Sequence, residues 1–155
     1  MWIEIFKTGI HTDSSGKSAE YSSETLDLIS QIYNQRISED PSFEAPIVKG
    51  HPASDDPAYG WVERLARRGT KLLAKIKDLQ PEILDEVTHR KFTRLSIAIY
   101  PDMMLRHVGL LGAAAPAIKG LKPVSFASED NFIEFKNFRI SIRFSCKFFC
   151  RKLGF

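Results

Sequence analysis

Cysteine is scarce in this chain. Only two are present among 155 residues, Cys146 and Cys150, and both lie close to the C-terminal end of the sequence. Two such residues cannot form a disulfide framework or a multi-cysteine metal cage, and their spacing is not that of a CxxC motif. This usage is typical of a reducing compartment.

Long apolar runs are also lacking. Residues 1–5 carry no basic segment, and the most apolar later stretch, residues 110–118, is interrupted by Gly112 and Pro116. Neither stretch has the pattern of a signal peptide or a membrane span. We therefore expect a soluble cytosolic protein, and the length suits one domain with a sizeable core.

Basic and acidic side chains are nearly equal in number except near the C-terminal end. Residues 1–121 carry 15 basic and 16 acidic side chains, whereas residues 122–155 carry 7 and 3. Seven of the eleven phenylalanines also lie between Phe132 and Phe155. We predict a domain over residues 1–125 and an atypical basic, Phe-rich segment over 126–155. We interpret that segment either as a final strand with a solvated tail or as a truncated or frame-changed continuation. We assign it no role in binding nucleic acid or membranes.

Hydrophobic periodicity predicts several elements. Residues 22–35 read as a helix, because Ser22 or Ser23 can cap its start and apolar residues recur every three to four positions. Residues 60–66 and 71–77 alternate as a hairpin requires. Trp61 in the first of these strands is predicted to be buried. A second, short helix is predicted to begin at Pro81, because proline at that position loses no intrahelical hydrogen bond.

Two further β-patterned segments, residues 92–100 and 105–111, carry polar residues of chemical interest. Their two-residue period places Ser96 on the face opposite the aliphatic side chains and fixes the direction of His107. Since the segments are close in sequence, we predict neighbouring strands. Residues 38–57, rich in proline, read as a loop that holds His51.

A serine hydroxyl becomes a nucleophile when a neighbouring base takes its proton and a third group orients that base. Ser96, His51 and His107 can fill these roles. The plainer interpretation is that Ser96 is a small strand residue, His51 a turn residue before a proline, and His107 a histidine of the core.

A metal site is a further alternative. His51, Asp55, Asp56 and His107 offer the nitrogen and oxygen ligands that suit zinc or manganese. The sequence contains no compact metal motif such as His-Glu-x-x-His, so this alternative has less support than the serine site.

Four segments in order carry a family resemblance: EAPIVKGHP at 44–52, PAYGWV at 57–62, RLSIAIY at 94–100, and LRHVGLLGA at 105–113, which continues to PAIKGL at 116–121. Together they resemble the head maturation proteases of Mu-like phages and prophages, over roughly residues 20–121. Prohead proteases of this group are thought to share the fold of the herpesvirus assemblins. The resemblance implies an α+β fold, mainly an antiparallel β-barrel or strongly curved sheet flanked by helices.

The resemblance also implies an activity. It makes the chain a serine endopeptidase, with Ser96 as nucleophile, His51 as base and His107 as third member; Asp55 or Asp56 can take the third role, which is often acidic in prohead proteases. The implied partners are phage scaffold and major capsid proteins, and further copies of the protease itself. The implied location is the cytoplasm of the bacterial host and the immature phage head. No cofactor is required.

Rival functions follow from the same residues. A degenerate prophage remnant that keeps the fold would act as a non-catalytic scaffold or assembly component. If the metal site forms instead, the protein would be a metallohydrolase. Mu-like members usually continue into a long internal-scaffold region, so we expect that function on another polypeptide or that this sequence is a fragment.

Overall fold

The computed structural model describes residues 1–13, 15–52 and 55–113, which form a mixed α+β fold. The predicted boundary near residue 125, the Phe-rich segment and both cysteines lie outside these residues. In chain order the elements are β1 (Trp2–Lys7), β2 (Gly9–Thr12), β3 (Ser18–Tyr21), α1 (Ser23–Glu39), a 3-10 helix η1 (Pro41–Phe43), β4 (Ile47–Lys49), β5 (Trp61–Arg68), β6 (Lys71–Lys77), α2 (Pro81–Thr88), β7 (Arg94–Ile99) and β8 (Leu105–Leu111).

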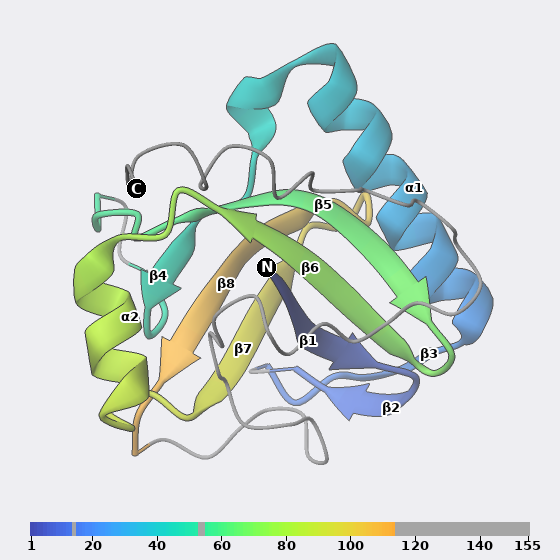
Figure 1. The fold of residues 1–155 in the computed structure, drawn as a ribbon. Helices are drawn as coiled ribbons and strands as arrows, with labels where there is room; N and C mark the ends of the chain where they lie inside the picture. The colour runs from blue at the N-terminus through green and yellow to red at the C-terminus, as the bar shows by residue number, and fades with distance from the viewer. Residues whose placement is uncertain (14, 53–54, 114–155) are drawn as a thin grey trace, which may run out of the picture.

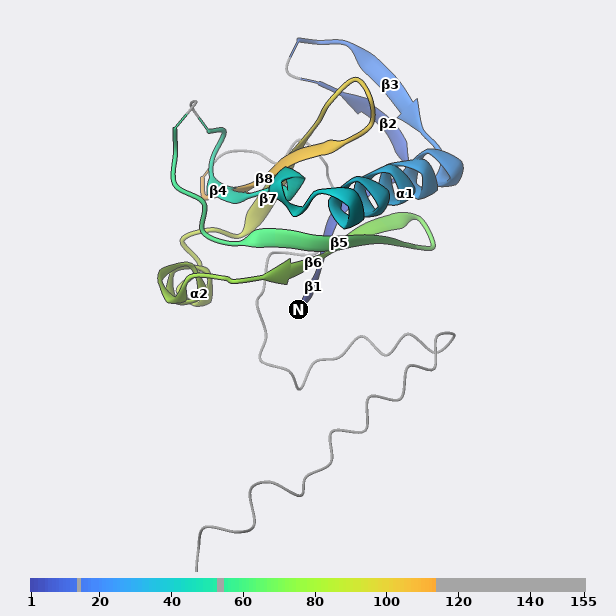
Figure 2. The ribbon, with the colours of Figure 1, turned by 90° about the horizontal axis from the view of Figure 1, so that it is seen from above.

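The strands form three small sheets, in the orders β1-β6-β5, β2-β3 and β4-β8-β7. The helices lie at opposite ends of the strands: α1 lies beside β5, and α2 lies near β4 (Figure 1, Figure 2). Both three-stranded sheets and both helices contribute buried side chains to one core. Within the described part of the chain, no helix is long and apolar enough to cross a membrane.

The predicted helix over residues 22–35 is confirmed as α1, which continues beyond the predicted end to Glu39. The Ser22 hydroxyl accepts a hydrogen bond from the Thr25 N–H (3.2 Å), which caps the start of the helix. Its buried side chains follow helical spacing: Leu26, Ile29, Ser30, Tyr33 and Ile37. The Tyr33 hydroxyl donates to the Val62 carbonyl (2.7 Å) and accepts from the Ala45 N–H (2.8 Å), so this one side chain joins the helix to β5 and to the segment before β4.

The predicted hairpin is confirmed as β5 and β6, which turn at Gly69 with a φ of +57°. The prediction that Trp61 is buried is wrong. Helix α1 covers the side of β5 that carries Val62 and Leu65, both almost fully buried, whereas Trp61 is 36% exposed. An alternating strand with one covered face sends the neighbouring side chain to the solvent.

The predicted second helix and the predicted neighbouring strands over residues 92–100 and 105–111 are also confirmed. Helix α2 begins at Pro81 and buries Ile83 and Val87. β7 and β8 are antiparallel neighbours. The segment expected to be a loop, however, contains β4, which pairs with β8 in the parallel direction, with Val48 opposite Gly109.

The expected antiparallel barrel or single strongly curved sheet is wrong. Over residues 1–13, 15–52 and 55–113 the three sheets are separate, none closes into a barrel, and β4 is parallel to its neighbour. Among the described residues, β4 and β5 are linked by one isolated bridge, between Pro46 and Trp61, and by nearby backbone hydrogen bonds such as Ile47 N–H to Gly60 O (2.8 Å). Pro46 has no N–H, so the ladder cannot continue through it. The mixed α+β class, the other part of the prediction, is confirmed.

Candidate active site

Ser96 and His107 lie on the same face of the sheet formed by β4, β8 and β7. Ser96 is directly opposite Gly109, and Ala98 is directly opposite His107. Residues that face each other across antiparallel strands project to the same side, and diagonal neighbours are typically about 7–8 Å apart, within reach of a long side chain. The predicted directions of Ser96 and His107 are therefore confirmed. Both residues are 5% exposed.

Two glycines bring the end of β4 close to this face. A β carbon added at Gly109 would lie 2.3 Å from the Gly50 carbonyl oxygen, so only glycine allows the two backbones to approach this far. The Gly50 N–H donates to the Leu110 carbonyl (2.8 Å), which continues the β4–β8 pairing to the residue before His51. Gly50 has a φ of +69°, in the left-handed region that favours glycine.

His51 follows that turn and reaches His107. The two imidazole rings have centroids 6.2 Å apart and are inclined at 74°, an edge-on arrangement. His51 is exposed, whereas His107 is buried. The structure thus brings together the two predicted histidines from segments more than fifty positions apart, on the face that carries Ser96.

Both ring nitrogens of His107 are buried, and neither has a hydrogen-bond partner among the described residues. Burial lowers the pKa of His107, and Arg106 and His51 lower it further. A buried histidine with a lowered pKa is neutral at pH 7 and keeps one nitrogen that donates and one that accepts. Buried polar atoms normally have hydrogen-bond partners. Because both nitrogens of His107 lack one among the described residues, the ring is available to orient a neighbouring group.

Lys49, the last residue of β4, fixes the position of the turn that follows. Its Nζ lies 2.9 Å from a Glu82 carboxylate oxygen and 2.8 Å from one of Glu86, both on α2. The ammonium also lies 4.5 Å from the centre of the Tyr59 ring. Hydrogen bonds from Glu86 and Glu82 raise the pKa of Lys49 well above its usual value. The sequence pattern did not predict a role for Lys49, although it directly precedes the Gly50-His51 pair.

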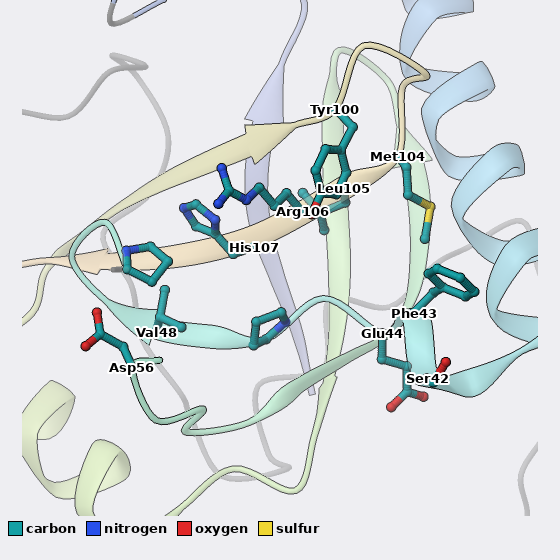
Figure 3. Close-up of a pocket in the computed structure, with 12 residues that line it drawn as sticks. Ser42, Phe43, Glu44, Val48, Asp56, Tyr100, Met104, Leu105, Arg106 and His107 are labelled. Atoms are coloured by element: carbon teal, nitrogen blue, oxygen red, sulfur yellow. The ribbon is translucent and has the colours of Figure 1, made fainter. Parts of the chain in front are cut away.

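A cleft of about 330 Å³ opens beside His107, between the start of β4 and the turn that joins β7 to β8 (Figure 3). Asp56 lines it and Asp55 does not, although both aspartates are exposed. Of the two aspartates predicted as substitutes for His107 in the third role, Asp56 is therefore the one that lines the same cleft as His107. No group of three or more potential metal ligands occurs in residues 1–13, 15–52 and 55–113, so the metal alternative receives no ligand set from them.

Comparison with protein-family models, with curated proteins and with solved structures gives no match to this chain. The family resemblance drawn from the four sequence segments therefore stays a prediction. What the structure adds is independent of it: the placement of Ser96, His51 and His107 follows from strand register and from the contact between two glycines.

Proposed function

We propose that this protein is a serine endopeptidase of the phage head-maturation type. The observation that supports it best is that the Gly50–Gly109 contact carries His51 to the buried His107, on the sheet face that also bears Ser96. A nucleophile, an exposed base and a buried orienting group are thus supplied by β7, by the turn after β4, and by β8.

The proposed reaction assigns one role to each side chain. The Ser96 Oγ attacks the scissile carbonyl carbon while His51 takes the hydroxyl proton, which forms the tetrahedral intermediate. His51 then gives the proton to the leaving amine as the peptide C–N bond breaks, and water releases the acyl group by the reverse sequence. His107, held neutral by burial, orients the His51 ring. Backbone amides are the expected oxyanion donors.

The substrates in this proposal are scaffold and major capsid proteins, and the protease itself. This assignment of substrates is based on the resemblance of residues 44–62 and 94–121 to the Mu-like proteases. The same resemblance supports action in the bacterial cytoplasm inside the immature head, with no cofactor.

A non-catalytic assembly component is the second candidate, and the burial of Ser96 favours it. At 5% exposure the serine is largely covered, which limits the approach of a substrate. A chain that keeps this fold without turnover would still present the same surface to capsid or scaffold proteins.

Incubation of the purified full chain with scaffold and major capsid protein of a Mu-like phage separates the candidates. The proposal expects discrete cleavage products that disappear in Ser96→Ala and persist in the presence of a chelator. Cleavage that survives Ser96→Ala would refute the assignment of the nucleophile. Co-sedimentation with the capsid protein without any cleavage would favour the assembly component, and loss of cleavage on chelation would favour a metallohydrolase.

A further inference from the structure

The cleft beside His107 has an apolar end. Phe43 from η1 and Tyr100 from the turn after β7 are each 48% exposed, and Met104, which lies with them at this end, is 5% exposed (Figure 3). Large aromatic side chains that remain half exposed at the mouth of a cleft are typical of binding surfaces. His107 and Asp56 lie toward the other end (Figure 3).

The charges at the cleft differ in how they are compensated. The Glu44 carboxylate is bound by Lys77 at 2.6 Å and is only 13% exposed, so its charge is largely neutralised. The exposed Arg106 guanidinium lies 5.8 Å from the centre of the Tyr100 ring, and no carboxylate in the described part of the chain pairs with it. A cation next to an apolar surface is complemented by a carboxylate next to an apolar side chain.

We infer that this cleft binds the substrate near the scissile bond and selects a peptide that carries a large apolar residue next to an acidic one. The apolar side chain packs between Phe43 and Tyr100, and the neighbouring carboxylate binds Arg106. The inference rests on the proposed function, because His107 joins the cleft to the candidate catalytic face. It adds a substrate class and three residues that determine specificity.

Binding is measured first, without catalysis. The Ser96→Ala protein is labelled with 15N and titrated with acetylated hexapeptide amides that contain Leu-Glu or Glu-Leu flanked by alanines. At least one of the two orders is expected to shift the amide signals of residues 43 and 100–107. Replacement of leucine by alanine in the peptide is expected to weaken binding about tenfold. Replacement of glutamate by glutamine is expected to weaken it about threefold and to reduce its salt dependence.

Protein variants test which side chains are responsible. Phe43→Ala and Tyr100→Ala are each expected to lower affinity for the leucine-containing peptide about tenfold and to remove the difference between leucine and alanine. Arg106→Gln is expected to remove only the preference for glutamate. Leu28→Ala is the matched control, because Leu28 is 46% exposed on α1 and lies outside the cleft.

The outcomes separate this inference from the proposed function. Peptide binding with the stated preferences but no cleavage by the wild-type chain would support the cleft and contradict the protease. Cleavage by the wild-type chain that Phe43→Ala, Tyr100→Ala and Arg106→Gln leave unchanged would overturn the cleft and keep the protease. Binding that Leu28→Ala weakens as much as Phe43→Ala, or no binding of either peptide, would overturn the cleft as well.

Discussion

The α carbon of Gly109 faces the carbonyl of Gly50 so closely that a β carbon at position 109 would lie 2.3 Å from the oxygen. Gly109 is also directly opposite Ser96 in the ladder between β7 and β8. Gly109 therefore has two roles. Its lack of a side chain lets the turn before His51 approach the sheet, and it leaves no side chain directly opposite Ser96.

Gly109→Ala is expected to destabilise the protein by about 3 kcal/mol, the upper end for overpacking a buried site, because the backbone of β4 must move away. Gly50→Ala is the comparison. A β carbon there meets nothing within 4 Å, and the residue retains only the strain of its positive φ, about 1 kcal/mol. Urea unfolding measures both. Equal losses would show that steric contact at position 109 is not what holds the turn.

Lys49 is expected to position His51 through α2. Lys49→Met removes both ion pairs with Glu82 and Glu86 and should lower kcat about tenfold with little change in KM, since the turn after β4 loses its anchor. Lys49→Arg keeps the charge and should restore most of the activity. Lys75→Met removes an exposed ion pair with Glu63 and serves as control. Equal effects of Lys49→Met and Lys75→Met on kcat would contradict the positioning role.

Tyr33→Phe is expected to cost about 1–3 kcal/mol of stability. The substitution keeps the ring but leaves the Val62 carbonyl and the Ala45 N–H without the buried hydroxyl that bridges them. Thermal or urea unfolding measures the loss, with the exposed Tyr100→Phe as control. A loss no greater than that of the control would mean that other groups satisfy these backbone atoms.

The lowered pKa of His107 predicts a pH dependence of stability. In the unfolded chain a histidine takes up a proton near its ordinary pKa of about 6.5, whereas folded His107 does so only at lower pH. The unfolded state therefore binds more protons below about pH 6.5, and stability falls as the pH drops from there through the folded pKa. His107→Gln should flatten this dependence between pH 7.5 and 5 in thermal unfolding. An identical slope in both proteins would contradict the buried neutral ring.

The elements that carry one dominant signal could be predicted from sequence. Helix α1 has a serine cap and an apolar stripe, the β5–β6 hairpin has two β-patterned segments around a glycine turn, and α2 begins with a proline. The faces of Ser96 and His107 followed from the two-residue period alone. These features depend on neighbours in the chain.

What the sequence did not predict depends on contacts between distant segments. Strand β4 has three residues, and its pairing with β8 is formed by residues about sixty positions away. Its one local signal was the β-branched pair Ile47-Val48 between prolines. The expected barrel failed as a prediction because the described part of β4 meets β5 at one isolated bridge, at Pro46. The roles of Lys49 and Gly109 are visible only once α2 and the turn at Gly50 are in place.

The most direct test of the central claim is covalent labelling of the purified full chain with a fluorophosphonate, followed by mass spectrometry of the tryptic peptides. One adduct is expected, on Ser96. Its formation should be abolished in His51→Ala and slowed but still measurable in His107→Ala, because an orienting group is only partly needed. An unmodified Ser96 in the wild-type chain, or labelling at full rate in His51→Ala, would contradict it.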